Sequence, residues 1–133
     1  MKHVITLIVL LAASALAEVP NTFKWYPPHG TSWAFEMSLD TTDHWDSTSS
    51  EHPPLSPQKA KDLATAFVQQ VPPYQSMTGW SISTITLRLM SRDPELWIYE
   101  VQFEGTGASV WGGPLPLFTV PVKMDGTIPI PIK

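Results

Sequence analysis

The sequence predicts an α+β fold in two layers, with one helix packed on an antiparallel sheet of four to five strands. One segment, residues 57–70, places its apolar residues three and four positions apart, as an amphipathic helix does. Four segments alternate apolar and polar residues, as strands with one buried face do: residues 33–40, 80–90, 96–104 and 117–124. The 133 residues, 43% of them hydrophobic and 15% charged, are enough for one domain with a modest core.

Residues 1–17 have the pattern of a signal peptide. Val4–Leu11 is almost entirely apolar, and Ala15–Ala17 supplies the small residues that a signal peptidase recognises. We expect cleavage before Glu18, which gives an exported protein, periplasmic or extracellular. The alternative is an uncleaved membrane anchor, but the apolar stretch is shorter than the roughly 20 residues that a spanning helix needs. No membrane insertion is therefore expected after cleavage.

Residues 18–32 are predicted to form a lead-in, and residues 33–133 a single α+β domain. The lead-in is rich in proline and carries Phe23, Trp25 and Tyr26 without a regular period. We expect it to be extended and to lie across part of the sheet.

The domain is predicted to begin with a strand and a long loop. Residues 33–40 alternate apolar and polar side chains, which indicates one buried face. Residues 41–54 are rich in Ser, Thr, Asp and Pro and have no apolar period, which predicts a surface loop.

The helix has a clear start and end in the sequence. Ser56 is suited to cap it, and Pro57 falls at the first helical position, where a missing N–H has no cost. Pro72-Pro73 ends the helix at about Gln70. One apolar stripe is expected to face the sheet: Ala60, Leu63, Ala64, Phe67 and Val68.

The later strands differ in regularity. In residues 80–90 the apolar positions change parity near Ser83-Thr84, which predicts a β-bulge. Residues 96–104 and 117–124 alternate cleanly. The linker between them, residues 105–116, has four glycines and is long for a hairpin loop, which favours a functional flap.

The C-terminal tail has three alternative arrangements. A two-residue turn at Asp125-Gly126 would pair Met124 with Thr127 and aim prolines at the partner strand. A three-residue loop would instead pair Met124 with Ile128, so that every inward position keeps its N–H. The third alternative is an unpaired polyproline-like tail.

The composition excludes several function classes. The formal charge is −4, and loss of Lys2 with the signal makes it more negative, which is the wrong sign for a nucleic-acid surface. The absence of cysteine excludes a disulfide scaffold and a Cys-based zinc site.

Residues suited to cation binding or catalysis gather in one acidic loop: Asp40, Asp43, His44, Asp46 and Glu51. The loop does not match a calcium-binding EF-hand, because Trp45 stands where the turn requires glycine. The histidines lack the spacing of a helical zinc pair, and no serine lies in a nucleophile elbow. We therefore expect a solvated loop, no metal or other cofactor, and no enzyme activity.

Three motifs occur in order along the chain: Leu55-Ser56-Pro57-Gln58-Lys59-Ala60, Trp97–Phe103, and Val122–Thr127. Together they make residues 55–133 similar to PepSY-like domains, which are small, exported and cystatin-like. The resemblance implies a helix cradled by an antiparallel sheet and a non-catalytic role in binding or restraining other proteins, often peptidases. The family's acidic-then-Thr-Gly ending is replaced here by Asp125-Gly126-Thr127, and no binding residue is transferred.

Two functions follow as hypotheses. The first is an exported, non-catalytic domain that binds a protein or peptide and modulates a peptidase; a second copy of the chain is the other candidate partner. The alternative is a small carbohydrate-binding module that uses exposed tryptophans. The residues expected to bind the partner lie in the two loops that carry a tryptophan: Trp45, Trp111, Gly112 and Gly113.

Overall fold

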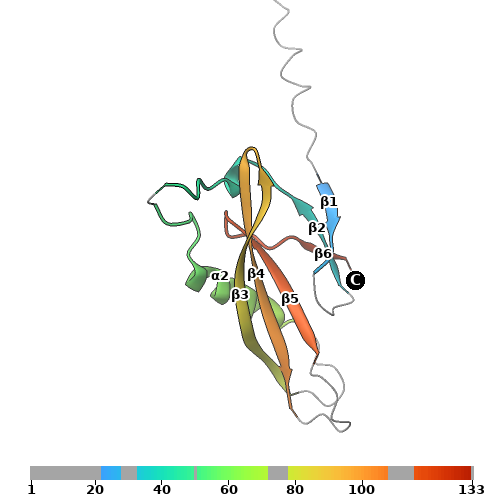
Figure 1. The fold of residues 1–133 in the computed structure, drawn as a ribbon. Helices are drawn as coiled ribbons and strands as arrows, with labels where there is room; N and C mark the ends of the chain where they lie inside the picture. Colours follow the sequence, from blue (N-terminus) through green and yellow to red (C-terminus); the bar gives the residue numbers. More distant parts are fainter. Residues whose placement is uncertain (1–21, 28–32, 50, 72–77, 108–115, 133) are drawn as a thin grey trace, which may run out of the picture.

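A computed structural model describes residues 22–27, 33–49, 51–71, 78–107 and 116–132. They form an α+β fold with one α-helix and two antiparallel sheets of three strands each (Figure 1). The predicted fold class is therefore confirmed, but the single sheet of four to five strands is wrong. The predicted signal peptide, residues 1–17, lies outside the described residues.

Each sheet joins segments from different parts of the chain. The first sheet has the order β1-β2-β6, formed by Thr22–Trp25, Ala34–Ser38 and Ile130–Ile132. The second has the order β3-β4-β5, formed by Gly79–Arg92, Glu95–Thr106 and Leu117–Lys123. A short 3₁₀ helix, η2 (Thr41–Asp43), and the helix α2 (Pro57–Val68) follow β2.

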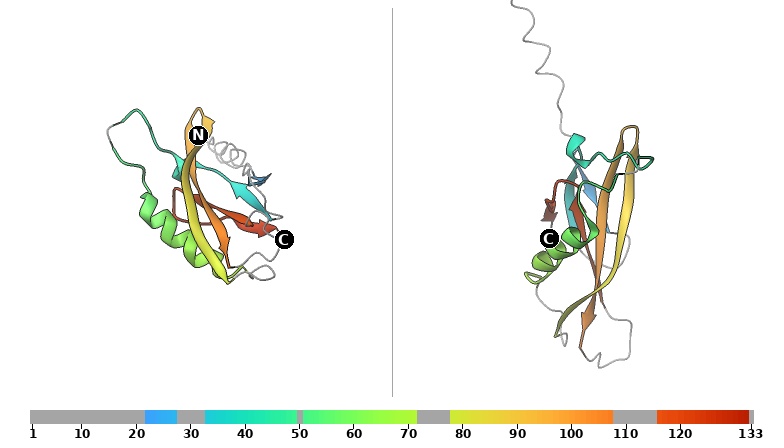
Figure 2. Two further views of the ribbon diagram at one scale, coloured as in Figure 1. Left: turned by 60° about the horizontal axis from the view of Figure 1, so that its bottom comes forward. Right: turned by 90° about the vertical axis from the view of Figure 1, so that its left-hand side faces the viewer.

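Helix α2 and the β1-β2-β6 sheet share one face of the β3-β4-β5 sheet (Figure 2). Two aromatic contacts join these three parts. The rings of Phe35 in β2 and Phe67 in α2 have centroids 6.0 Å apart, and Trp33 meets Phe118 of β5 edge-on at 5.2 Å. The second sheet therefore covers apolar area that one helix is too narrow to cover.

Helix α2 begins as predicted and ends two residues earlier. The Ser56 hydroxyl accepts a hydrogen bond from the Lys59 N–H at 3.1 Å, and Pro57 occupies the first turn. Ala60, Ala64 and Val68 are its buried residues. These small side chains allow the helix to lie close to the sheet.

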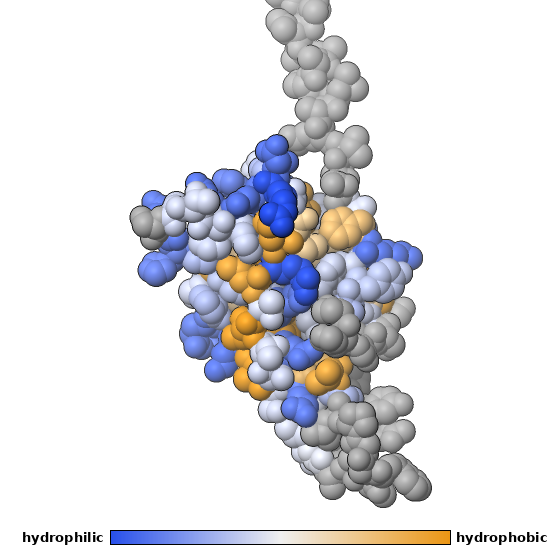
Figure 3. Space-filling model, in the orientation of Figure 1, coloured by the Kyte–Doolittle hydropathy of each residue, from blue (hydrophilic) through white to orange (hydrophobic). Residues whose placement is uncertain are grey.

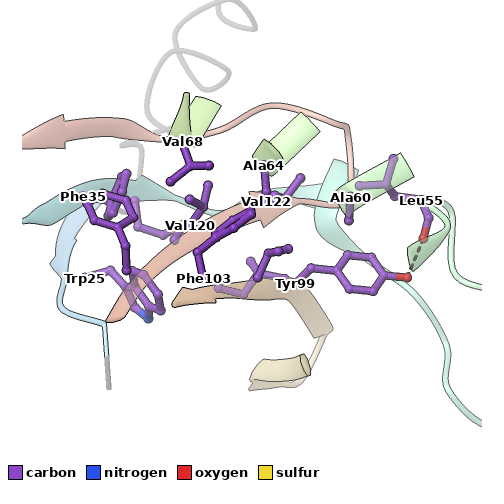
Figure 4. Packing of buried hydrophobic residues seen from close by; sticks show 14 of the residues in the cluster. Trp25, Phe35, Leu55, Ala60, Ala64, Val68, Tyr99, Phe103, Val120 and Val122 are labelled. Atoms are coloured by element: carbon purple, nitrogen blue, oxygen red, sulfur yellow. Dashed lines mark hydrogen bonds between the residues drawn. The ribbon is translucent and has the colours of Figure 1, made fainter. Parts of the chain in front are cut away.

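The core lies between α2 and the two sheets (Figure 4). Its largest fully buried side chains include Phe35, Met37, Tyr99 and Phe103. The Tyr99 hydroxyl donates to the Leu55 carbonyl at 2.6 Å, so the residue before the helix cap is tied to the middle of β4.

The predicted bulge in β3 is confirmed. The register with β4 shifts between Ile82 and Thr84, which leaves Ser83 as the extra residue. Because of this shift, Ile82 lies opposite Phe103 and Ile85 lies opposite Val101, on the same face of the sheet. One bulge thus keeps the apolar residues of both halves of β3 on the helix side.

Part of the lead-in is a strand, which the sequence did not indicate. Thr22–Trp25 pairs antiparallel with β2, and Trp25 lies opposite Phe35. Trp25 is 8% exposed and contacts the Phe35 ring at 6.1 Å. The lead-in therefore contributes a side chain to the core.

All three predicted arrangements of the C-terminal tail are wrong. The Lys123 N–H donates to the Thr127 carbonyl at 2.9 Å, around a turn whose Gly126 has a φ of 86°. The chain then leaves β5, and Ile130–Ile132 pairs with β2. Prolines 129 and 131 have no N–H, so the isoleucines between and after them are the donors available to β2.

Within the part of the chain that the structure describes, no helix is long and apolar enough to cross a membrane.

Candidate functional site

Strand β3 forms an open edge of its sheet. It is 14 residues long, and β4 is its single partner strand among the described residues. Natural proteins usually protect such edges with Pro, Lys or very short strands. β3 contains neither Pro nor Lys, and its two charged residues, Arg88 and Arg92, lie in its second half. Its protective features are two register shifts with β4, between Ile82 and Thr84 and between Leu89 and Ser91.

Apolar side chains lie along this edge. Ile82 is 36% exposed and Ile85 is 37% exposed, although both share a face of the sheet with the buried Val101 and Phe103 of β4. Figure 3 shows apolar surface gathered over β3. The helix covers the centre of the sheet and leaves this margin open. We call Ile82, Ile85 and the outer backbone of β3 the edge surface.

A pocket lies between the end of α2 and the start of β3. Its volume is about 240 Å³. The described residues that line it carry no charge: Thr65, Val68, Gln69, Val71, Thr78, Gly79, Trp80 and Phe103. Trp80 and Ile82 are two residues apart on one strand, so the pocket lies next to the edge surface.

Trp80 has an unsatisfied donor. Its ring packs on Phe118, with centroids 5.7 Å apart, and its indole Nε1 is buried. Within the described part of the molecule, this N–H has no hydrogen-bond acceptor. A buried N–H without an acceptor is rare in folded proteins, because it has lost its bond to water.

The opposite face of β3 carries an ion pair. The Arg88 guanidinium binds both carboxylate oxygens of Glu100, through Nε to Oε1 and through Nη2 to Oε2, the latter at 3.0 Å. Glu100 is 5% exposed, whereas the Arg88 side chain is partly open to solvent. This pair fixes β3 to β4 and leaves the edge itself unpaired.

The structure describes one of the four predicted partner-binding residues. Trp45 is half-buried and meets Trp97 edge-on, with centroids 5.4 Å apart. Its Nε1 donates to the Glu51 carbonyl at 3.3 Å. It lies at the turn between β3 and β4, at the opposite end of the hairpin from Trp80. Trp111, Gly112 and Gly113 lie outside the described residues.

The acidic loop makes hydrogen bonds to the rest of the protein, whereas the sequence predicted a solvated loop. The His44 ring bonds to the Glu95 carbonyl at 2.9 Å, and the Ser47 N–H donates to the Glu95 carboxylate at 2.9 Å. Asp43 is fully buried, which the sequence did not indicate, and burial raises the pKa of its carboxyl. Among the described residues, no three His, Asp or Glu side chains are placed to hold a metal ion.

Hydrogen bonds from threonine hydroxyls hold two neighbouring carboxyls in their charged form. The Thr42 hydroxyl lowers the pKa of Asp40, and the Thr48 hydroxyl, at 2.7 Å, lowers the pKa of Asp46. Both bonds are local to the loop. They stabilise its turns.

The sequence reasoning missed the edge surface and the pocket. It placed Ile82 and Ile85 in a strand with a bulge. A period of two identifies the face of the sheet on which a residue lies, but it does not show how much of that face a helix covers. The available signal was a long apolar strand without the residues that protect an edge.

No family model, no curated protein and no solved structure matches this chain, so its similarity to PepSY-like domains stays a prediction.

Proposed function

We propose that this protein is an exported, non-catalytic domain that binds an extended segment of another protein along the open edge of β3. The observation that supports the proposal is the edge surface: a 14-residue strand that pairs with β4 alone in the described part of the chain, with Ile82 and Ile85 partly exposed.

The physical basis is addition of a strand to the sheet. The free N–H and C=O groups of an edge bind the backbone of an extended segment, and alternate side chains of that segment reach the adjoining surface. Ile82 and Ile85 provide apolar contacts for those side chains on the helix side. The affinity comes mainly from the backbone, and the specificity comes from these contacts.

The similarity to PepSY-like domains suggests a peptidase as the class of partner. This is a narrower form of the same proposal, since an exported peptidase that presents an extended segment would meet the requirement of the edge.

The carbohydrate-binding alternative has less support from the described tryptophans. Sugar binding needs exposed, flat rings, whereas these rings are tilted or edge-on against other aromatic rings. The contacting pairs are Trp25–Phe35, Trp33–Phe118, Trp45–Trp97 and Trp80–Phe118.

The test begins with selection of random 12-residue peptides, displayed on phage, against the chain from Glu18 onward. Selected peptides are titrated into the wild type and two variants. Ile85→Lys places a charge on the edge surface, and Thr86→Lys makes the same change at the next, exposed residue on the opposite face. We expect Ile85→Lys to weaken binding at least about tenfold and Thr86→Lys less than about threefold.

Three results would overturn the proposal. Equal effects of the two lysine variants would place the peptide elsewhere. Failure to select any peptide, with tryptophan fluorescence changed by soluble polysaccharides, would favour the carbohydrate alternative. A dimer of the wild type that Ile85→Lys converts to a monomer would make a second copy of the chain the occupant of the edge.

A further inference from the structure

We propose that the segment bound at the edge of β3 pairs antiparallel with residues 84–89 and carries apolar side chains at the two positions opposite Ile85 and Leu87. The inference rests on the proposed function, because it needs a segment that adds to this edge. It names the class of segment that the edge selects: two apolar residues, neither of them proline, on either side of one polar residue.

One hydrogen bond gives the direction of the backbone groups in β4. The Thr106 carbonyl accepts from the Thr78 N–H at 2.7 Å, just before β3 begins, so the Thr106 backbone points toward the β3 side. Along an antiparallel strand, successive residues direct their N–H and C=O groups to opposite sides. Both register shifts add a residue to β3 and none to β4, so this alternation is unbroken in β4. Gln102, Glu100 and Ile98 therefore direct their backbone groups to β3.

The direction of the backbone groups in β3 follows from the pairing. On the other side of β4, the Gly105 N–H donates to the Pro116 carbonyl at 2.8 Å, away from β3, as the alternation requires. Thr84, Thr86 and Arg88 lie opposite the residues of β4 that point toward β3, so their backbone groups bond to β4. The residues between them direct their N–H and C=O groups to the open edge.

The outward backbone groups and the apolar side chains belong to the same two residues, Ile85 and Leu87. Their side chains share a face with Val101 and Tyr99, which lie opposite them in β4 and are buried in the core. In an antiparallel pair, residues directly opposite each other place their side chains on the same face. The two residues of the segment that bond to Ile85 and Leu87 therefore place their side chains over the apolar margin. The residue between them faces the other side, next to the exposed Thr86, where a polar side chain is favoured.

The stretch open to strand addition is short. The register between β3 and β4 shifts between Ile82 and Thr84 and again between Leu89 and Ser91. A bulge bends its strand and interrupts the ladder, so a straight segment pairs between the two shifts. Antiparallel pairing is the arrangement of every strand pair in the described part of the chain, and it is slightly more stable per residue than parallel pairing.

Amide hydrogen exchange of the ¹⁵N-labelled chain from Glu18 onward tests the direction of the backbone groups. Without a peptide, we expect the N–H groups of Ile85 and Leu87 to exchange at least about tenfold faster than those of Thr86 and Arg88, which β4 protects. A peptide from the phage selection should then slow exchange at Ile85 and Leu87 at least about tenfold. The reverse order in the free chain, or no slowing at saturation with peptide, would overturn the proposed pairing.

Backbone N-methylation of the selected peptide, one residue at a time, tests the residue pattern. We expect binding to weaken at least about tenfold at two apolar residues that are two positions apart, because each loses a hydrogen bond to β3. The polar residue between them is the matched control, and its methylation should weaken binding less than about threefold. A loss at the polar residue instead would indicate a parallel segment and overturn the pattern.

The two proposals fail separately. Peptides that bind equally well to the wild type and to Ile85→Lys would overturn the proposed function, whatever the exchange rates of the free chain. Peptides that need Ile85 but lose binding on methylation of consecutive residues would keep the edge and overturn the alternating pairing.

Discussion

Asp43 joins two distant parts of the chain through one buried carboxylate. It accepts hydrogen bonds from the N–H groups of Asp40 and Met124, at 3.1 Å each, and lies 3.4 Å from the Lys123 ammonium. The loop after β2 is thereby attached to the turn after β5. A polar loop sequence gives no indication of such a contact, because one of its partners, the Met124 N–H, lies 81 residues away in the sequence.

Replacement of Asp43 should destabilise the fold. Asp43→Ala leaves the buried Met124 N–H and the Lys123 ammonium without their acceptor, and we expect the free energy of unfolding to fall by about 1 to 3 kcal/mol. Urea denaturation measures it. Asp46→Ala is the control, since Asp46 is exposed and its hydrogen bonds stay within its own loop. Equal losses in the two variants would contradict the role given to Asp43.

The carboxyls of the acidic loop should change the stability of the fold with pH in opposite directions, Asp40 and Asp46 in one and Asp43 in the other. The lowered pKa values of Asp40 and Asp46 contribute stability that is present above their ordinary value, about 4, and is lost as pH falls through the lowered values. The raised pKa of Asp43 contributes stability below that ordinary value, which is lost as pH rises through the raised value.

The free energy of unfolding should therefore fall between about pH 5 and about pH 2, and it should fall more steeply in Asp43→Asn, which lacks the opposing titration. Denaturation at a series of pH values measures both slopes. A variant slope equal to or shallower than that of the wild type would show that the Asp43 pKa is not raised.

At the scale of single elements, helix α2 is held by its contact with β2 as well as by the larger sheet. Phe67 is half-buried and contacts Phe35, so Phe67→Ala removes a link between the two. We expect a loss of about 2 to 3 kcal/mol, at or below the lower end of the range for a fully buried phenylalanine. Thermal and urea unfolding measure it.

Gln69→Ala is the matched control for the helix, because Gln69 is exposed at the helix end and its side chain should contribute less than about 0.5 kcal/mol. If both variants unfold alike, Phe67 does not join the helix to β2.

Elements with a local signal could be predicted from the sequence. The cap at Ser56 and the parity change at Ser83 each depend on neighbouring residues, and the structure has both. The alternation in residues 96–104 predicts one buried face, which is wrong in the middle of β4, where Ile98 and Glu100 are buried as well. The partners of β1 and β6 could not be predicted. Both pair with β2, and a short strand with one apolar face fits several edges equally well until the whole fold is formed.

The candidate site was partly predictable for the same reason. The sequence placed Trp80 and the isoleucines of β3 on one face after the bulge, but their exposure depends on where the helix lies across the sheet. Whether the Trp80 indole N–H has a hydrogen-bond acceptor depends on all the residues that pack around its ring. Such features are properties of packing and have no local pattern.

At the scale of the whole molecule, the stability of the fold depends on how much of the apolar face of the β3-β4-β5 sheet is covered. Strands lie about 4.8 Å apart and a helix is about 10 Å wide, so one helix cannot cover a three-stranded sheet together with its large aromatic side chains. The β1-β2-β6 sheet covers the remainder on the β5 side, where Trp33 contacts Phe118. The β3 side keeps its open margin.

Deletion of residues 18–26 should therefore expose apolar surface. The deletion removes β1 and with it Trp25, a buried ring that contacts Phe35, and it leaves one edge of β2 without a partner. We expect a loss of at least about 3 kcal/mol, the value for removal of one buried aromatic side chain, and binding of a dye that recognises exposed apolar surface. Tyr26→Ala is the control, because Tyr26 is 68% exposed and should neither destabilise the fold nor bind dye. A deletion variant as stable as the wild type and free of dye would show that the β2-β6 pair covers the sheet without β1.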